Sequence, residues 1–113
     1  MERNELLEVT MELALRVIAY CELLEKDRRY VIARQLLKSG TSIGACSREA
    51  QGAESRADFI HKLKIAYKEA METEYWIALC EKSNSYINPP QELKTNLDSS
   101  IKLLGKIISS SKK

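Results

Sequence analysis

The sequence has few residues that interrupt helices and no long apolar run. Only four glycines and two prolines occur among 113 residues, which gives little support to a fold of strands and tight turns. No apolar stretch reaches the roughly 18 residues that cross a bilayer, and the first residues lack the basic-then-apolar order of a secretion signal. We therefore expect one cytoplasmic domain, residues 1–113, that does not contact a membrane.

Metal-binding and redox-active residues are also scarce. The chain has one histidine, His61, and three widely separated cysteines, Cys21, Cys46 and Cys80. The close Cys or His spacing of a zinc site is absent. Single cysteines within predicted helices are typical of small buried side chains in a reducing compartment. The sequence therefore predicts no cofactor, no metal site and no catalytic thiol.

The residues that are abundant favour helices. The chain is 44% hydrophobic and 30% charged, and it is rich in the strong helix formers Leu, Ala, Glu and Lys. Apolar residues at three- and four-residue intervals predict helices over Glu5–Lys26, Tyr30 to about Ala50 and Ala57–Lys82, and a fourth that opens after Asn88. Because the connections are short, we expect an all-α fold, an antiparallel up-down-up-down four-helix bundle.

Local signals predict where these helices begin and end. Gly52 suits the left-handed conformation that often follows a helix. Ser55 is the predicted N-cap of the third helix, with Asp58 in the position of the capping-box acid. For the fourth helix the predicted N-cap is Asn88, with Pro89 and Pro90 in the first turn, where no backbone donor is needed.

The second helix contains two glycines, Gly40 and Gly44, in its predicted interior. Each costs about 1 kcal/mol of helix stability relative to alanine, so something must offset them. We favour close packing against a neighbouring helix, or a slight bend. A phosphate-binding loop would need a preceding strand and the GxxxxGK[ST] order, which are absent. The predicted inward line of this helix is Ile32, Leu36, Ser39, Ile43, Cys46 and Ala50.

Two helices carry more apolar surface than one small bundle needs. The first helix has an inward stripe (Leu6, Thr10, Leu13, Val17, Tyr20, Cys21, Leu24) and a second one beside it (Leu7, Met11, Leu15, Ile18). On the third helix, the flank of the inward stripe mixes apolar side chains with carboxylates. Because exposed apolar stripes are costly for a lone domain, we predict a subunit interface that contains Leu7, Leu15, Ile65, Trp76 and Leu79.

Charge is unevenly distributed along the chain. The net charge is +2, but residues 1–27 carry three basic and seven acidic groups, whereas residues 28–68 carry nine basic and three acidic groups. A basic segment on a nearly neutral protein favours an anionic partner. The candidate nucleic-acid-binding residues are Arg34, Lys38, Arg48, Arg56, Lys62, Lys64 and Lys68.

Five segments of the second and third helices resemble a known family of bacterial proteins. The segments are RQLLKSGTSIGA from residue 34, EAQG from residue 49, SRADFIHKLKIA from residue 55, KEA from residue 68 and ETEYW from residue 72. They are similar to the small four-helix bundle proteins encoded in intervening sequences of 23S ribosomal RNA genes. One departure is Cys46-Ser47-Arg48-Glu49, where the family pattern usually has Asn-Ile-Ala-Glu.

The resemblance implies a homo-oligomer, with a ring of five as the associated form, and no enzymatic activity. A more distant resemblance connects the chain with the accessory variability proteins of diversity-generating retroelements, similar bundles that bind nucleic acid through basic surface. Together with the basic segment, this favours a homo-oligomer that binds RNA or DNA, including ribosomal RNA, through a cationic surface repeated on each subunit. Few aromatic residues are free for base stacking, so we expect backbone contacts.

Two other hypotheses remain. In the first, the protein is a structural or protein-interaction oligomer, in which the basic segment of one subunit contacts the acidic first helix of the next. In the second, Asp58-x-x-His61 and Glu69-x-x-Glu72 contribute to a di-iron carboxylate site. Such sites use a Glu-x-x-His motif on each of two helices, so a single histidine argues strongly against the second.

The carboxylates of Glu49 and Glu72 also invite a structural interpretation. We predict that they pair with Arg34 in a partly buried network. A buried pair would make either carboxylate important for stability, whereas an exposed pair would contribute little.

Overall fold

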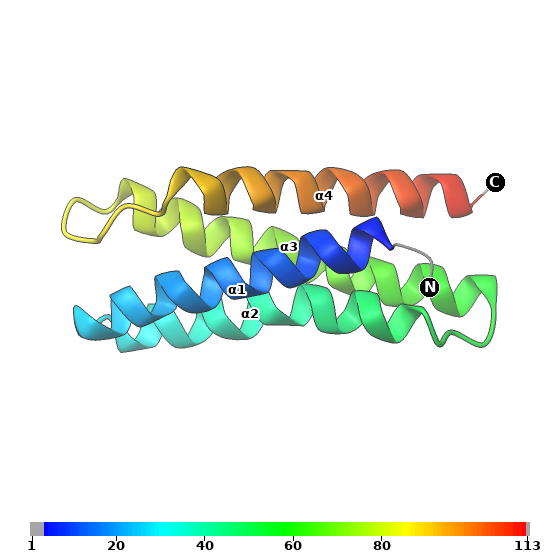
Figure 1. Ribbon diagram of the computed structural model, residues 1–113, viewed down its shortest axis with the longest axis horizontal. Coiled ribbons are helices and arrows are strands. Elements are labelled where there is room, and N and C mark those ends of the chain that lie inside the picture. Colours follow the sequence, from blue (N-terminus) through cyan, green and yellow to red (C-terminus); the bar gives the residue numbers. More distant parts are fainter. Residues whose placement is uncertain (1–3, 113) are drawn as a thin grey trace.

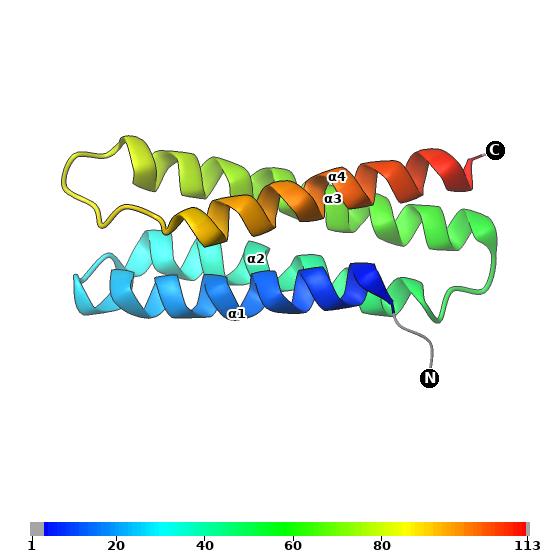
Figure 2. The ribbon, with the colours of Figure 1, turned by 45° about the horizontal axis from the view of Figure 1, so that its top comes forward.

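The computed structural model describes residues 4–112, which form four helices: α1 (Glu5–Lys26), α2 (Tyr30–Ala50), α3 (Arg56–Lys82) and α4 (Gln91–Ser111). Consecutive helices run in opposite directions, and α4 returns to pack beside α1 (Figure 1). The diagonal pairs, α1 with α3 and α2 with α4, do not approach closely. Seen after a 45° rotation, the result is an antiparallel bundle (Figure 2). The predicted all-α fold is confirmed.

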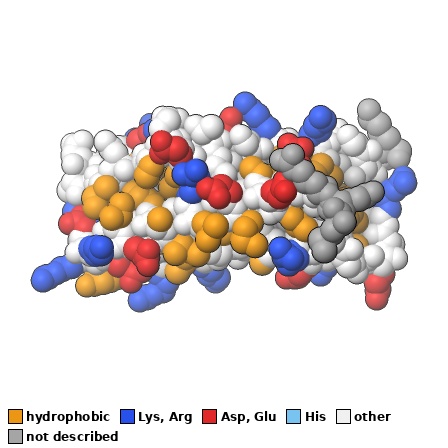
Figure 3. Space-filling view, viewed as in Figure 1, with side chains coloured by type: hydrophobic (Ala, Val, Ile, Leu, Met, Phe, Trp, Pro, Cys, Tyr) orange, Lys and Arg blue, Asp and Glu red, His pale blue; other side chains and the backbone are white. Residues whose placement is uncertain are grey.

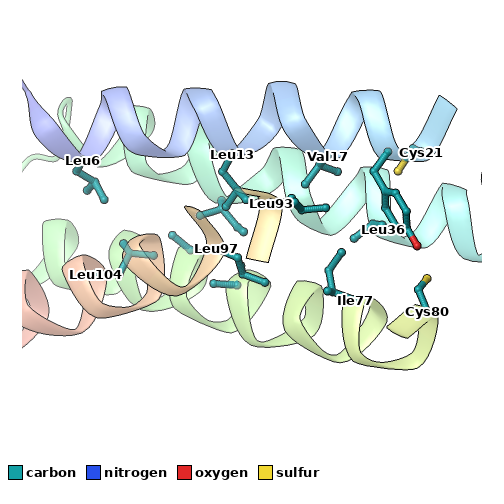
Figure 4. Close-up of a cluster of buried hydrophobic side chains, with 14 of the residues drawn as sticks. Leu6, Leu13, Val17, Cys21, Leu36, Ile77, Cys80, Leu93, Leu97 and Leu104 are labelled. Atoms are coloured by element: carbon teal, nitrogen blue, oxygen red, sulfur yellow. The ribbon is translucent and has the colours of Figure 1, made fainter. Parts of the chain in front are cut away.

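One stripe from each helix forms the core. All seven residues of the predicted inward stripe of α1 are buried, and labelled leucines from α1, α2 and α4 point into the same interior (Figure 4). In α3, the buried residues are Leu63, Ala66, Ala70, Thr73, Ile77 and Cys80, and Phe59 is half-buried and packs against the core. In α4, the buried residues are Leu93, Leu97, Ser100, Leu104 and Ile108, and Ile101 is half-buried.

The prediction for α2 needs a correction. Ile32 and Cys46 lie half-buried at the edge of the core, whereas Ala33, Gly40 and Ser47 are buried. The other four members of the predicted line, Leu36, Ser39, Ile43 and Ala50, are buried, so the buried face of α2 is centred slightly to one side of that line. Small residues then occupy the side of α2 that meets α1.

The two glycines of α2 allow this close approach. A Cβ atom on Gly40 would lie 2.7 Å from Cγ1 of Val17 in α1, and one on Gly44 would lie 3.3 Å from the backbone oxygen of Thr10. The Thr10 hydroxyl donates to the Leu6 carbonyl at 2.8 Å, within its own helix. Helix packing therefore accounts for the glycines, as predicted, since contact with α1 offsets their low helix propensity.

The left-handed conformation predicted at Gly52 is wrong, although α2 ends at Ala50 as predicted. Gly52 does not adopt a positive φ angle, whereas Arg28, in the turn between α1 and α2, has a φ of 64°. The Arg29 and Arg28 amides there donate to the carbonyls of Leu24 at 2.8 Å and Glu25 at 2.9 Å, which is the Schellman pattern. This pair of hydrogen bonds fixes the left-handed residue in the α1–α2 turn.

At the other ends, the third helix is capped as predicted and the fourth is not. Ser55 caps α3 by accepting from the Asp58 amide at 3.0 Å, while the Asp58 carboxylate accepts from the Glu54 amide at 3.2 Å. The cap position of α4 is Pro90 instead of Asn88, and no side chain caps it. Because the chain stays extended through Pro90, both prolines precede the helix.

Candidate interaction surfaces

An apolar surface lies along the outer side of α1, beside the seam with α2. It consists of Leu7, Met11, Leu15 and Ile18, here called the α1 patch; Met11 is 50% exposed and Leu15 54%. Figure 3 shows hydrophobic side chains in a band along this face, with charged side chains on either side. The patch combines two predicted interface residues, Leu7 and Leu15, with the other residues of the same stripe.

A groove of about 190 Å³ continues the α1 patch onto α2. Its α2 wall contains Thr41, Gly44, Ala45 and Arg48. The groove exists because Gly44 and Ala45 add almost no side-chain volume where α2 crosses α1. An apolar floor with one cation at its edge suits a bulky side chain from another molecule.

A second apolar surface lies on the outer side of α3. It consists of Ile65, Tyr75, Trp76 and Leu79, here called the α3 patch; Tyr75 is 58% exposed. Trp76 is half-buried against the core, its ring centre lies 5.4 Å from that of Tyr75, and its indole N–H donates to Glu72 at 3.2 Å. Sequence reasoning missed Tyr75, although its position one residue before Trp76 places it on the outer face.

The five predicted interface residues therefore form two patches. Leu7 and Leu15 belong to the α1 patch, whereas Ile65, Trp76 and Leu79 belong to the α3 patch. Because α1 and α3 are diagonal in the bundle, no single flat surface contains both patches. One molecule thus has two unlike apolar faces.

The seven predicted cationic residues are also divided among faces. Arg34, Lys38 and Arg48 are exposed on α2, at spacings that place them along its outer side; they are here called the α2 ridge. Lys64 and Lys68 are exposed on the outer side of α3. Of the remaining two, Lys62 is half-buried and Arg56 is the first residue of α3.

The groove between α2 and α3 contains carboxylates among these cations. Lys62 Nζ lies 3.9 Å from a carboxylate oxygen of Glu49. The pKa of the Glu69 carboxyl is raised, first by burial and then by nearby Glu72, while Lys38 opposes the rise. The groove is therefore of mixed charge, and Lys38 of the α2 ridge borders it.

The predicted network around Arg34 does not form. Glu72 accepts a hydrogen bond from Trp76, and Glu49 faces Lys62. Within residues 4–112, Arg34 forms no salt bridge, because it projects from the outer side of α2 and not into the groove. This side chain is free to meet a partner.

The thiols lie in surroundings that keep them protonated. Burial raises the pKa of the Cys21 thiol to about 12 and also raises the pKa of Cys80. The pKa of the half-buried Cys46 is raised too, mainly by burial and then by Glu49 and Glu69. In the described part of the chain, no three His, Cys, Asp or Glu side chains gather as metal ligands would. No helix described there has the length and apolarity to cross a membrane.

Comparison with known proteins agrees with this architecture. The family model for the 23S rRNA-intervening sequence protein matches residues 2–110. The chain belongs to this family. It is also similar to the crystal structure of a protein of unknown function from the S23 ribosomal protein family of Bacteroides thetaiotaomicron. That match has 40% sequence identity and a TM-score of 0.85, and it covers 91% of this chain and 97% of the other.

These findings confirm the family resemblance and the fold. A comparison with curated proteins found no match. The family match extends from residue 2 to residue 110, so it includes the α1 patch, the α2 ridge and the α3 patch.

Proposed function

We propose that this member of the family is a non-enzymatic, cytoplasmic homo-oligomer that binds the backbone of RNA or DNA through the α2 ridge. The observation that carries the proposal is that Arg34, Lys38 and Arg48 are all exposed on one helix and none forms a salt bridge within residues 4–112. Free guanidinium and ammonium groups bind phosphate oxygens strongly. The ridge is therefore suited to a polyanion.

Oligomerisation would convert a weak contact into a useful one. Three cations bind only a few phosphates, but each additional subunit adds the same ridge, and linked contacts raise the overall affinity. The exposed α1 and α3 patches support association with further copies, and a ring of five is the form that the family resemblance implies. Contacts of this kind read the phosphate backbone and give little sequence specificity.

A non-enzymatic role is supported by the chemistry of the candidate nucleophiles. The raised pKa values of all three thiols leave them without thiolate character at neutral pH, and the thiolate is the reactive form. The only histidine, His61, is exposed on α3, and the Cys21 and Cys80 side chains are buried. None of these arrangements is typical of a nucleophile activated by a base.

The proposal is tested by fluorescence anisotropy of a labelled ribosomal RNA hairpin at low and at physiological salt. We expect binding that weakens steeply with salt, because each neutralised phosphate releases about 0.7 to 0.9 counterions. Combined Arg34→Ala, Lys38→Ala and Arg48→Ala substitutions should lower the affinity more than about tenfold and flatten the salt dependence. The control is Lys102→Ala with Lys106→Ala, two cations on α4 outside the ridge, and this variant should bind like the wild type.

A structural or protein-interaction oligomer remains the second candidate. The mixed charge of the α2–α3 groove, including the contact between Lys62 and Glu49, favours it, because part of the basic segment is already neutralised within the chain. An oligomer that does not bind the hairpin even at low salt would select this candidate. If the α2 variant and the α4 control lose the same amount of affinity for the hairpin, the α2 ridge is not the binding surface.

A further inference from the structure

We infer that an unpaired nucleobase stacks on Tyr30, at the end of the α2 ridge, while the ridge holds the backbone of the same strand. The inference rests on the proposed binding of nucleic acid and adds the form of the ligand, a single-stranded segment instead of a duplex. Tyr30 is the first residue of α2, and its side chain is 54% exposed. It is thus an exception to the expectation that few aromatic residues are free for base stacking.

Tyr30 lies in line with the α2 ridge. Tyr30, Arg34 and Lys38 are exposed and follow one another at four-residue intervals, which places them on the same side of the helix. At about 1.5 Å per residue, Arg34 lies about 6 Å and Lys38 about 12 Å beyond Tyr30 along the helix axis. A strand whose phosphates contact the two cations therefore passes close enough for a base to reach the tyrosine ring.

The Tyr30 ring also borders an open recess of about 200 Å³, at the end of the bundle where the α1–α2 turn meets the loop between α3 and α4 (Figure 1). This surface, here called the Tyr30 recess, is lined by Arg28, Arg29, Tyr30, Val31, Ile32 and Tyr86. A closed cavity of about 150 Å³ accommodates benzene, so the recess has room for one planar ring. Within residues 4–112, no other ring or cation lies against Tyr30, whereas the exposed ring of Tyr75 already packs 5.4 Å from Trp76.

Local contacts fix the far wall of the Tyr30 recess. Arg29 donates to the Ser85 carbonyl at 2.9 Å, and its guanidinium lies 4.5 Å from the centre of the Tyr86 ring. On the next residue, the Ile87 carbonyl accepts from the Tyr20 hydroxyl at 2.6 Å. The α3–α4 loop is therefore tied to the α1–α2 turn, and a site that is already ordered loses less entropy when a ligand binds.

The charge along this side of α2 favours a polyanion. Residues 28–48 contain five cations and no carboxylate. Three carboxylates border this segment, and each lies near a cation: Asp27 near Arg29, Glu49 near Lys62 and Glu69 near Lys38. Exposed carboxylates on the last turns of α1 lie in a separate depression, lined by Glu22, Glu25 and Lys26. Phosphate groups therefore meet a cationic surface from the recess along the ridge.

Arg28 gives the Tyr30 recess a cation of its own. Its side chain is exposed and forms no ion pair within residues 4–112, although its φ of 64° is a conformation that glycine adopts more easily. A guanidinium beside an exposed aromatic ring suits a nucleotide, which joins a planar base to a phosphate. Val31, 75% exposed, adds an apolar rim, whereas the exposed Leu23 and Ile87 at this end are aliphatic and lie outside the recess.

The test compares a short RNA of unpaired uridines with a blunt RNA duplex of the same length, by fluorescence anisotropy with the full chain. Tyr30→Leu should lower the affinity for the single strand about tenfold, because stacking on an aromatic ring is lost, and should leave the affinity for the duplex unchanged. Tyr30→Phe keeps the ring and should bind like the wild type. The matched control, Tyr75→Leu, removes a 58% exposed ring outside the recess and should change neither affinity. Circular dichroism and sedimentation velocity check that each variant keeps its fold and assembly.

Arg28→Gly tests the phosphate contact in the same recess. It should weaken binding to the single strand although it favours the fold. It should also reduce the slope of the logarithm of affinity against the logarithm of salt concentration by about 0.7, the value for one phosphate contact on a single strand. Tyr30→Leu changes no charge and should leave that slope as it is in the wild type.

Several results would overturn the inference. If Tyr30→Leu binds the single strand like the wild type, or loses equal affinity for both ligands, Tyr30 does not stack on an unpaired base. The α2 ridge remains supported in that case if its own triple variant still loses binding. If Tyr75→Leu weakens binding as much as Tyr30→Leu does, the effect is not specific to the recess. If the wild type binds neither ligand at low salt, the inference and the proposed nucleic-acid binding are both wrong.

Discussion

Glycines in two helices of this bundle have opposite surroundings. At Gly40 in α2, an added Cβ would lie 2.7 Å from Val17, but at Gly105 in α4 it would lie 3.8 Å from the Tyr67 ring. The first distance excludes a side chain, whereas the second is an ordinary contact. Both glycines lower helix stability relative to alanine. Only at Gly40 does close packing against a neighbouring helix offset that loss.

Buried polar groups show the same difference between the α2–α3 seam and the α1–α4 seam. Between α2 and α3, the buried hydroxyls of Ser39 and Thr73 lie 2.9 Å apart in a hydrogen bond. On α4, Oδ1 of Asn96 is buried without a hydrogen-bond partner among the described protein atoms, beside an open surface depression of about 370 Å³ between α1 and α4. The buried hydroxyl pair stabilises the contact between α2 and α3, whereas the unpaired Asn96 oxygen weakens the contact between α1 and α4. We therefore expect α4 to detach first in partial unfolding.

The largest expected effect compares core leucines from the two parts. Leu36→Ala in α2 should lower the free energy of unfolding by about 4 kcal/mol, and Leu97→Ala in α4 by about 2.5 kcal/mol, because a looser seam can collapse around the lost side chain. Both leucines are buried. Urea unfolding measures the difference, and equal losses would contradict a looser seam at α4.

The glycines themselves give the next prediction. Gly40→Ala should destabilise the fold by about 1 to 2 kcal/mol, since overpacking exceeds the gain in helix propensity. Gly105→Ala should instead stabilise it by about 0.5 to 1 kcal/mol. Adding Val17→Ala to Gly40→Ala should restore part of the loss, and a double-mutant cycle measures that coupling. Additive effects would mean that Val17 is not the obstacle.

A pH dependence tests the burial of Cys21 at the α1–α2 seam, where its thiol donates to the Ala33 carbonyl at 3.4 Å. The folded pKa of about 12 lies above the ordinary value of 9.0, so the unfolded chain loses this proton first. Stability should fall as pH rises from about 9 toward 12, and Cys21 should account for about 1.4 kcal/mol at pH 10. Unfolding at pH 7 and pH 10 checks this, and Cys21→Ala should flatten the slope by that amount.

The smallest effects concern the connections. Arg28→Gly should stabilise the protein by about 0.5 kcal/mol, because glycine adopts the observed positive φ without the strain of a side chain, which outweighs its greater freedom when unfolded. Gly52→Ala should also stabilise it by about 0.5 kcal/mol, since Gly52 has no positive φ. Thermal unfolding compares the two variants. If Gly52→Ala instead lowers the stability, Gly52 does need the left-handed conformation that the sequence predicted.

Several features were predictable because one local pattern dominates. Apolar spacing predicted the helix from Glu5 to Lys26 with its seven buried residues, since burial of one face repeats every 3.6 residues. Ser55 was recognisable as a cap because its hydrogen bond is local. Asn88 was a plausible cap by the same reasoning, but the extended conformation at Pro90 moved the start of α4. Such predictions fail where two neighbouring residues favour different helix starts, as Asn88 and Pro90 do here.

The sequence by itself determined the four helices, the all-α class and the family, because periodicity and local motifs are properties of neighbouring residues. Only the tertiary structure decided that the two groups of predicted interface residues lie on diagonal helices, that Arg34 stands apart from Glu49 and Glu72, and that Lys62 faces Glu49 across the α2–α3 groove. These features depend on how each helix is rotated about its axis. Small residues such as Gly40 and Ser47 set the rotation of α2 through contacts with other helices, and a hydrophobic pattern does not record such contacts.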